Sequence, residues 1–138
     1  MNENSIKSPI RVYMGDLVHT WEKTSQWMMP LNVGLIASYA KKELGATIEI
    51  ELFKDPSALI EAIKTSPPNV LALSHYVWNT NLNSHVFDLA KGIGSNILTI
   101  GGGPSFTIHN ATPEVASEYF ALHQSTDAWV LDQGELGF

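Results

Sequence analysis

The sequence contains no cysteine and few basic residues, and both shortages limit what the chain can do. Without cysteine it can build no disulfide, no thiolate metal site and no iron–sulfur cluster. Eight lysines and arginines against fourteen aspartates and glutamates give a net charge of -6, and the basic residues are scattered. A nucleic-acid surface needs clustered positive charge to neutralise phosphates, so we expect no nucleic-acid partner.

Long hydrophobic runs are also absent. No apolar stretch approaches the roughly 18 residues that a membrane span needs, and the polar N-terminus lacks the apolar core of a signal peptide. We therefore predict a cytoplasmic protein that does not bind membranes. The 138 residues are 44% hydrophobic and 16% charged, as is typical of a globular domain. We predict a polar tail over residues 1–10 and one domain over residues 11–138.

Strand-like and helix-like segments alternate along the chain. Hydrophobic patterns and helix-start signals predict strands at 11–17, 47–53, 69–74, 96–103 and 127–135, and helices at 30–46, 56–66, 82–92 and 113–125. This alternation is typical of βαβ units with right-handed crossovers. It predicts an α/β fold: a doubly wound, flavodoxin-like (Rossmann-like) sheet of five parallel strands in the order 2-1-3-4-5. The second segment, "TIEIELF", alternates strictly, which favours a strand at a sheet edge.

Unusual segments follow four of the predicted strands. The first strand leads into "GDLVHTWEKTSQWMMP" (15–30), which is much longer than the usual connection of about 2–6 residues. The third leads into "SHYVWNTN" (74–81), the fourth into "GGGPSF" (101–106) and the fifth into "DQGELGF" (132–138). Ligands of doubly wound sheets bind outside the carboxyl ends of the strands, so we expect a site where these segments meet.

Several functions of this fold fit the segments poorly. A phosphoacceptor receiver domain needs an aspartate after the third strand and a lysine after the fifth, where Ser74 and Asp132 stand. A flavodoxin holds the FMN phosphate in a short loop rich in glycine and hydroxyls, but the first loop is long and has no glycine after Gly15. A dinucleotide-binding motif would follow the first strand, and here the glycines follow the fourth. No nucleophile–base or carboxylate pair suggests an independent enzyme. An interaction module that binds FMN or no cofactor remains the alternative.

Six segments in the same order resemble the N-terminal cobalamin-binding domain of cobalamin-dependent radical S-adenosylmethionine (SAM) enzymes. They are GDLVHTWEKTS, MPLNVGLIASYAKK, LFKDP, LSHYVWNTN, GGGPSF and DQGELGF. In that family the nucleotide tail of cobalamin leaves the cobalt and enters a slot between the strand ends and a helix. The resemblance implies bound methylcobalamin or hydroxocobalamin in this base-off form. It also implies a radical SAM barrel as partner, in a longer protein or in trans, and methyl transfer as the reaction.

The resemblance implies roles for residues that follow the strands. Gly101 and Gly102 would let the backbone approach the tail, and Ser74 would donate a hydrogen bond to the tail base or its ribose. Aromatic side chains would pack against the corrin ring, and polar ones would meet its amides. The predicted cofactor-binding residues are Gly15, Asp16, His19, Thr20, Trp21, Thr24, Ser25, Ser74, His75, Tyr76, Val77, Trp78, Asn79, Gly101, Gly102, Gly103, Pro104, Gly134 and Glu135.

His19 is a candidate for the lower cobalt ligand. In methionine synthase and the mutases a D-x-H-x-x-G motif supplies this histidine. Here His19 comes three residues after Asp16 instead of two, and the glycine of the motif is missing. His75 is a weaker candidate, and the resemblance favours an apolar side chain, Val77 or Trp78, below the cobalt. The barrel's cysteine motif is absent, so we expect binding and not catalysis, from an excised domain or a stand-alone cobalamin carrier.

Overall fold

Five parallel strands form one sheet in the order β2-β1-β3-β4-β5. They are β1 (Ile10–Gly15), β2 (Ile48–Phe53), β3 (Val70–Ser74), β4 (Leu98–Gly102) and β5 (Ala128–Val130). The computed structural model describes residues 8–20, 29–104, 106 and 111–138. The predicted α/β class and strand order are confirmed, and β2 lies at a sheet edge as its alternating sequence predicts.

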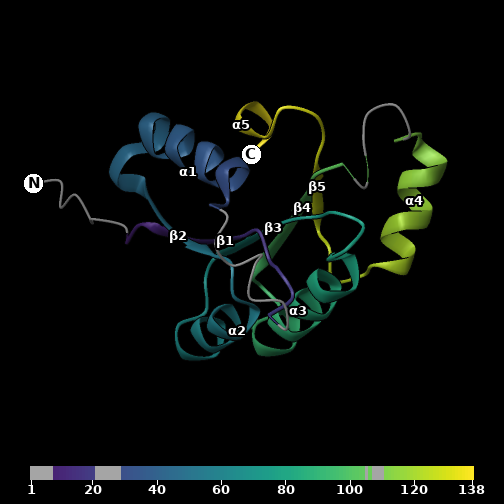
Figure 1. Cartoon of the computed structure of the whole chain (residues 1–138), viewed down its shortest axis with the longest axis horizontal. Coiled ribbons are helices and arrows are strands. Elements are labelled where there is room, and N and C mark those ends of the chain that lie inside the picture. The colour runs from purple at the N-terminus through teal and green to yellow at the C-terminus, as the bar shows by residue number, and fades with distance from the viewer. Residues whose placement is uncertain (1–7, 21–28, 105, 107–110) are drawn as a thin grey trace, which may run out of the picture.

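Helices cover both faces of the sheet, as a doubly wound fold requires. They are α1 (Leu31–Leu44), α2 (Pro56–Thr65), α3 (Thr80–Ile93), α4 (Pro113–Leu122) and α5 (Gly134–Gly137), with a short 3₁₀ helix, η2 (Gly45–Thr47). Figure 1 shows α1 and α5 on one face, α2 and α3 on the other, and α4 on the β5 side of the molecule. None of the helices in the described part of the chain is long and apolar enough to span a membrane.

Local sequence signals set several helix ends. The Asp55 side chain accepts a hydrogen bond from the Ser57 N–H, and Pro56 occupies the first turn of α2. Thr112 caps α4 in the same way, ahead of Pro113. At the C-terminal end of α1, Gly45 has a φ of 56°, a value that glycine adopts without strain.

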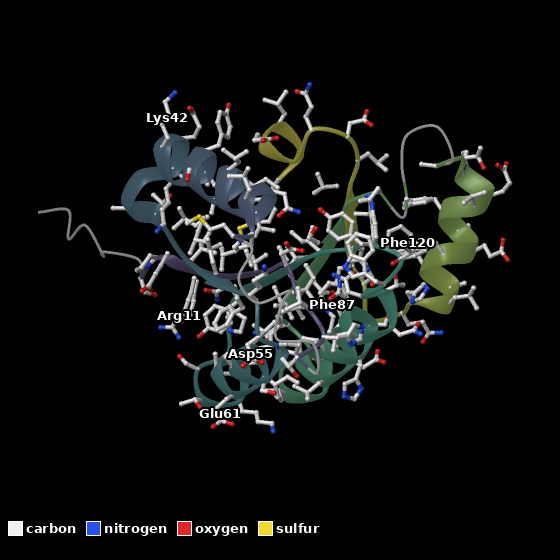
Figure 2. All side chains as sticks on the ribbon, viewed as in Figure 1. Arg11, Lys42, Asp55, Glu61, Phe87 and Phe120 are labelled. Carbon is white, nitrogen blue, oxygen red and sulfur yellow. The ribbon has the colours of Figure 1, made fainter. Side chains whose placement is uncertain are left out.

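The two faces of the sheet differ in how fully they are packed. On β3, Leu71 and Leu73 face α2 and α3 in the larger core, which also contains Phe87, labelled in Figure 2. The alternate residues Ala72 and Ser74 face α1, where the core is smaller. Because side chains alternate across a strand, the small residues of β3 all lie on the α1 side and leave space there.

The predicted fifth strand, 127–135, is shorter in the structure. It ends at Val130, and Asp132 has a φ of 57°. A left-handed backbone at that residue breaks the extended conformation, and aspartate tolerates it better than most residues. The chain then turns into the short helix α5, which the sequence patterns did not predict.

A cavity at the carboxyl ends of the strands

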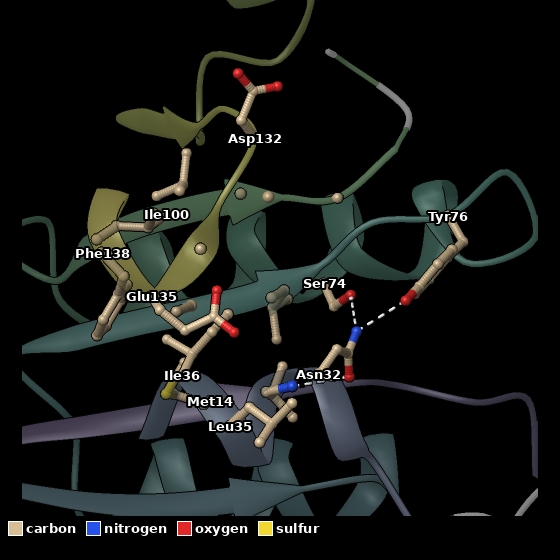
Figure 3. Close-up of a pocket in the computed structure, with 18 residues that line it drawn as sticks. Met14, Asn32, Leu35, Ile36, Ser74, Tyr76, Ile100, Asp132, Glu135 and Phe138 are labelled. Atoms are coloured by element: carbon tan, nitrogen blue, oxygen red, sulfur yellow. Dashed lines mark hydrogen bonds between the residues drawn. The ribbon is translucent and has the colours of Figure 1, made fainter. Parts of the chain in front are cut away.

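A cavity of about 330 Å³ lies at the carboxyl ends of the strands, between the sheet and helices α1 and α5 (Figure 3). This volume falls within the range of small-ligand pockets, about 300–1,000 Å³. Its lining residues are Met14, Asn32, Val33, Leu35, Ile36, Ala72, Leu73, Ser74, Tyr76, Ile100, Gly101, Gly102, Gly103, Val130, Asp132, Gly134, Glu135 and Phe138. The site therefore lies where the fold predicts it, and the third, fourth and fifth strand exits all contribute to it.

Gly101 and Gly102 both line the cavity, but their missing side chains leave room on opposite sides of the sheet. Gly102 lies on the same face as Ile100, and a Cβ built on Gly102 would meet only Val130, at an ordinary 3.7 Å. A Cβ on Gly101 would lie 2.4 Å from Cε3 of Trp129 on the far face. Gly102 thus opens the cavity, whereas Gly101 makes room for an aromatic ring of the protein.

Three other predicted glycines are required by packing. Gly103 has a φ of 119°, and a Cβ there would lie 2.4 Å from the His75 carbonyl oxygen. Gly134 lets α5 approach α1, since a Cβ would meet the Ile36 side chain at 2.5 Å. Gly15 is buried away from the cavity. A Cβ on it would lie 2.7 Å from the Leu73 side chain.

Asn32 links the polar groups of the cavity. Its Nδ2 donates hydrogen bonds to Ser74 Oγ at 2.9 Å and to Tyr76 Oη at 2.8 Å. The sequence reasoning named Ser74 and Tyr76 but missed Asn32. The available signal was position: Asn32 is the second residue of the helix that follows the long first loop, and that helix end faces the strand ends.

Two carboxylates give the cavity a negative character. The Glu135 side chain extends from α5 towards the cavity, and Asp132 lies nearby after β5 (Figure 3). Among the described residues that line the cavity there is no lysine, arginine or histidine. In a partly enclosed space this arrangement disfavours an anionic ligand and favours hydroxyl and amide donors.

Asn79 holds two strand exits together from beneath the site. Its buried Nδ2 donates to the carbonyl oxygens of Leu17, at 3.0 Å, and Ser74, at 3.1 Å. Its Oδ1 accepts from the Tyr76 N–H at 2.8 Å. Asn79 is fully buried and is not part of the cavity lining. It fixes the loops that carry the site.

His75 also lies away from the cavity. Its ring is fully buried and packs against Phe87 and Trp129, with centroid separations of 5.6 and 4.9 Å. Neither ring nitrogen has a hydrogen-bond partner among the described residues. Burial and, to a smaller extent, the charge of His123 lower the pKa of His75 to about 4. The ring is therefore neutral at ordinary pH.

The described part of the first loop is joined to the third strand exit. His19 is exposed, and its Nε2 lies 2.8 Å from the Trp78 carbonyl oxygen. Because a carbonyl oxygen only accepts, the Nε2–H group of His19 is the donor in this hydrogen bond. Asp16 is half-buried, and burial raises its pKa, an effect that Lys54 partly offsets.

Of the other predicted residues of this loop, only some lie in the part of the chain that the structure describes. Thr20 is exposed, while Trp21, Thr24 and Ser25 lie outside the described residues. His19 does not line the cavity. The described residues contain no group of three or more histidine, aspartate or glutamate side chains placed to bind a metal. His19 thus remains a predicted cobalt ligand that would act alone.

Exposed apolar side chains lie at the third strand exit and on neighbouring elements of the chain. Tyr76 stacks on Trp78 with a centroid separation of 4.5 Å and an interplanar angle of 5°. Trp78 is 60% exposed and its neighbour Val77 is 87% exposed. Pro104 of the fourth exit and Leu35 of α1, which also lines the cavity, are exposed as well. Stacked aromatics of this kind offer a platform for a broad, flat, apolar ligand.

Two curated proteins are related to the chain by sequence. One is 2-(S-pantetheinyl)-carbapenam-3-carboxylate methyltransferase from Streptantibioticus cattleyicolor, and the other is the cobalamin-dependent radical SAM methyltransferase TokK from Streptomyces tokunonensis. Each is 30% identical to the chain over 115 residues. The chain is a homologue of one part of these methyltransferases. The match covers 80% of the chain but only 16% of each relative, and no family model matches the chain.

Solved structures share the fold of this chain. A cobalamin-binding protein from Desulfitobacterium hafniense superposes with a TM-score of 0.63 at 10% identity, covering 93% of this chain and 55% of that one. A pilus assembly protein, CpaE from Caulobacter crescentus, gives a TM-score of 0.54 at 12% identity, covering 89% of this chain and 87% of that one. At such identities the likeness concerns the fold alone. The sequence relatives therefore confirm the resemblance to radical SAM enzymes. Because the shared fold does not identify a ligand, the ligand has to be inferred from the cavity.

Proposed function

We propose that the chain binds cobalamin, as methylcobalamin or hydroxocobalamin, and serves as the B12-binding domain of a radical SAM methyltransferase. The observation that carries the proposal is the cavity beside Gly102, in a chain whose sequence relatives include a cobalamin-dependent methyltransferase. In this proposal residues 11–138 form the binding domain, residues 1–10 are a tail, and the protein works in the cytoplasm.

The size of the cavity suggests which part of cobalamin enters it. A space of about 330 Å³ suits the base and ribose of the nucleotide tail better than the wide corrin ring. We propose that the tail enters base-off, beside Gly102, while the corrin lies over the opening against the Tyr76–Trp78 stack. Exposed Val77 or Trp78 then shields the lower face of the cobalt.

Each polar group of the cavity has a task in this arrangement. Ser74 and Tyr76 donate hydrogen bonds to acceptors on the tail, and the Glu135 carboxylate accepts from a ribose hydroxyl. Cobalamin, when bound, would supply a methyl group carried on cobalt. The chain's own contribution is to bind the tail, keep the base away from the cobalt and orient the exposed upper face towards a radical SAM barrel, in cis or in trans.

The cavity disfavours the alternative cofactor, FMN. An FMN phosphate is normally held by backbone N–H groups, hydroxyls or cations in a short loop. Here the described lining carries the carboxylates of Asp132 and Glu135 and no cationic side chain. The dianionic phosphate of FMN would be repelled here, and in the proposed cobalamin complex only the base and ribose enter, while the singly charged phosphodiester of the tail lies at the opening.

Calorimetric titration of the purified chain with methylcobalamin and, separately, with FMN tests the proposal. We expect saturable one-to-one binding of methylcobalamin at micromolar concentrations and no heat of binding with FMN. Binding of FMN, or no binding of methylcobalamin, would contradict the proposed function.

A further inference from the structure

The orientation of the Asn32 amide is fixed by the helix that carries it. The backbone N–H of Val33 donates to Asn32 Oδ1 at 2.8 Å. An N–H group cannot accept, so the oxygen of the amide must face Val33 and the nitrogen must face the cavity. Figure 3 shows this nitrogen between the hydroxyls of Ser74 and Tyr76, with a hydrogen bond to each.

This contact determines the role of both hydroxyls. An amide nitrogen only donates, so Ser74 Oγ and Tyr76 Oη must both accept from Asn32. Each hydroxyl keeps its own hydrogen, and neither donates it to another residue in the described ranges. Both residues line the cavity. A ligand that enters therefore meets two O–H donors at this point.

We propose that Asn32 is a specificity-determining residue of the cavity, because it holds the Ser74 and Tyr76 hydroxyls as donors and so selects a nucleotide tail that presents an acceptor there. This inference rests on the proposed function and names the tail chemistry that the site recognises. A benzimidazole that has left the cobalt has one unprotonated ring nitrogen, which is such an acceptor. That nitrogen has one lone pair and accepts from one of the two hydroxyls, so a tail base without a ring nitrogen leaves this donor unpaired, at a cost in affinity.

Asn32→Asp is the sharpest variant to test the role of the amide. The aspartate has nearly the same shape and still accepts from the Val33 N–H, but its second oxygen accepts where the nitrogen donated. The Ser74 and Tyr76 hydroxyls then donate to Asp and are no longer available to the ligand. Asn81→Asp is the matched control, since Asn81 is the exposed second residue of α3, away from the cavity. Both changes place a negative charge at a helix N-terminus, where it is favourable.

The measurement is the dissociation constant of each variant for methylcobalamin and for methylcobinamide, which lacks the nucleotide tail. We expect Asn32→Asp to weaken methylcobalamin binding about ten- to a hundredfold, as two lost hydrogen bonds imply, without weakening methylcobinamide binding. Asn81→Asp should leave both constants within about twofold of the wild type.

Two outcomes would overturn the proposal, and a third, distinguishable from them, would overturn the proposed function. Equal weakening of both ligands by Asn32→Asp would place its effect on the corrin and not on the tail. Unchanged methylcobalamin binding would show that the hydroxyl orientation does not matter. Failure of the wild-type chain to bind methylcobalamin would instead overturn the proposed function on which the inference rests.

Tyr76→Phe gives a second test that does not alter Asn32. It removes one O–H donor but keeps the ring that stacks on Trp78. We expect about a tenfold loss in affinity for methylcobalamin and an unchanged affinity for a cobamide whose tail base is a phenol without a ring nitrogen. Equal losses for the two cobamides would contradict the proposed selectivity.

Discussion

At the scale of single residues, two adjacent glycines of β4 show how the site is separated from the core. Gly102 faces the cavity and Gly101 faces Trp129. The sequence indicates that glycines follow the fourth strand, but it does not indicate which face each of them serves. The strand register decides this, and it predicts opposite effects for the same substitution at the two positions.

Gly102→Ala should stabilise the fold and weaken cobalamin binding. Its Cβ would meet only Val130 at 3.7 Å, so the loss of backbone freedom in the unfolded chain should raise stability by up to about 1 kcal/mol. The same methyl group occupies space proposed for the tail, and we expect about a tenfold loss of methylcobalamin affinity. Thermal denaturation and absorption titration measure the two effects.

Gly101→Ala is the neighbouring control for this prediction. Its Cβ would lie 2.4 Å from the Trp129 ring, so we expect a destabilisation of about 1–3 kcal/mol from overpacking. If Gly102→Ala bound methylcobalamin as tightly as the wild type, the tail would not lie beside Gly102.

His75 should make the fold less stable in mild acid. Its ordinary pKa of 6.5 is lowered to about 4, first by burial and then by the charge of His123. Between these values the unfolded chain takes up a proton that the folded chain does not, so stability falls as the pH decreases. The full loss is about 3 kcal/mol, reached as the pH approaches 4.

Urea denaturation isolates this contribution when the wild type and His75→Leu are compared between about pH 7 and about pH 4, the interval in which proton uptake differs between the folded and unfolded chains. The leucine cannot titrate, so the variant should lose less stability over the same interval. Identical pH dependence in the two proteins would show that His75 is not buried in its neutral form.

At the scale of the elements, the site depends on how loops and helices are joined. Asn79→Ala should cost about 3 kcal/mol, because it leaves the Leu17 carbonyl and the Tyr76 N–H without their partner and removes one of the two donors to the Ser74 carbonyl, the other being Asn83. Denaturant unfolding measures the loss. Asn81→Ala, on the exposed surface of α3, should change stability by less than about 0.5 kcal/mol. Similar values for the two variants would contradict the linking role of Asn79.

The sequence predicts most helices and strands correctly, but it does not predict α5, which forms one side of the cavity. The alternating sequence of β2 and the capping residues of α2 and α4 are local signals, and the structure confirms the edge strand and both caps that they predict. By contrast, α5 is held by tertiary contacts that no local pattern reports. Its Gly134 and Gly137 let it pack against Ile36 and Val130.

The site was predictable to the same extent. The strand exits are visible in the sequence because the fold places them at one edge, and Ser74, Tyr76 and Glu135 were named on that basis. Asn32 comes from a helix that crosses back over the sheet, so its contact with Ser74 joins residues far apart in the chain. A helix-start asparagine carries no sign of such a contact in the sequence.

At the scale of the whole molecule, the fold and the charge together limit which ligands the chain can bind. A cobalamin-binding protein and a pilus assembly protein share this architecture, so the sheet alone specifies no ligand. The net charge of -6 and the carboxylates of the cavity disfavour phosphate-rich ligands. The sequence relatives, the position of the cavity and its chemistry together support the proposal that the ligand is cobalamin.

The most direct test of the central claim is the absorption spectrum of methylcobalamin during titration with the wild-type chain. If the tail leaves the cobalt and enters the cavity, the spectrum should change from the base-on to the base-off form in proportion to the bound fraction. His19→Ala, measured in parallel, should give the same base-off spectrum if an apolar side chain lies below the cobalt. Methylcobalamin that binds but keeps its base-on spectrum would contradict the account, because the tail would then lie outside the cavity.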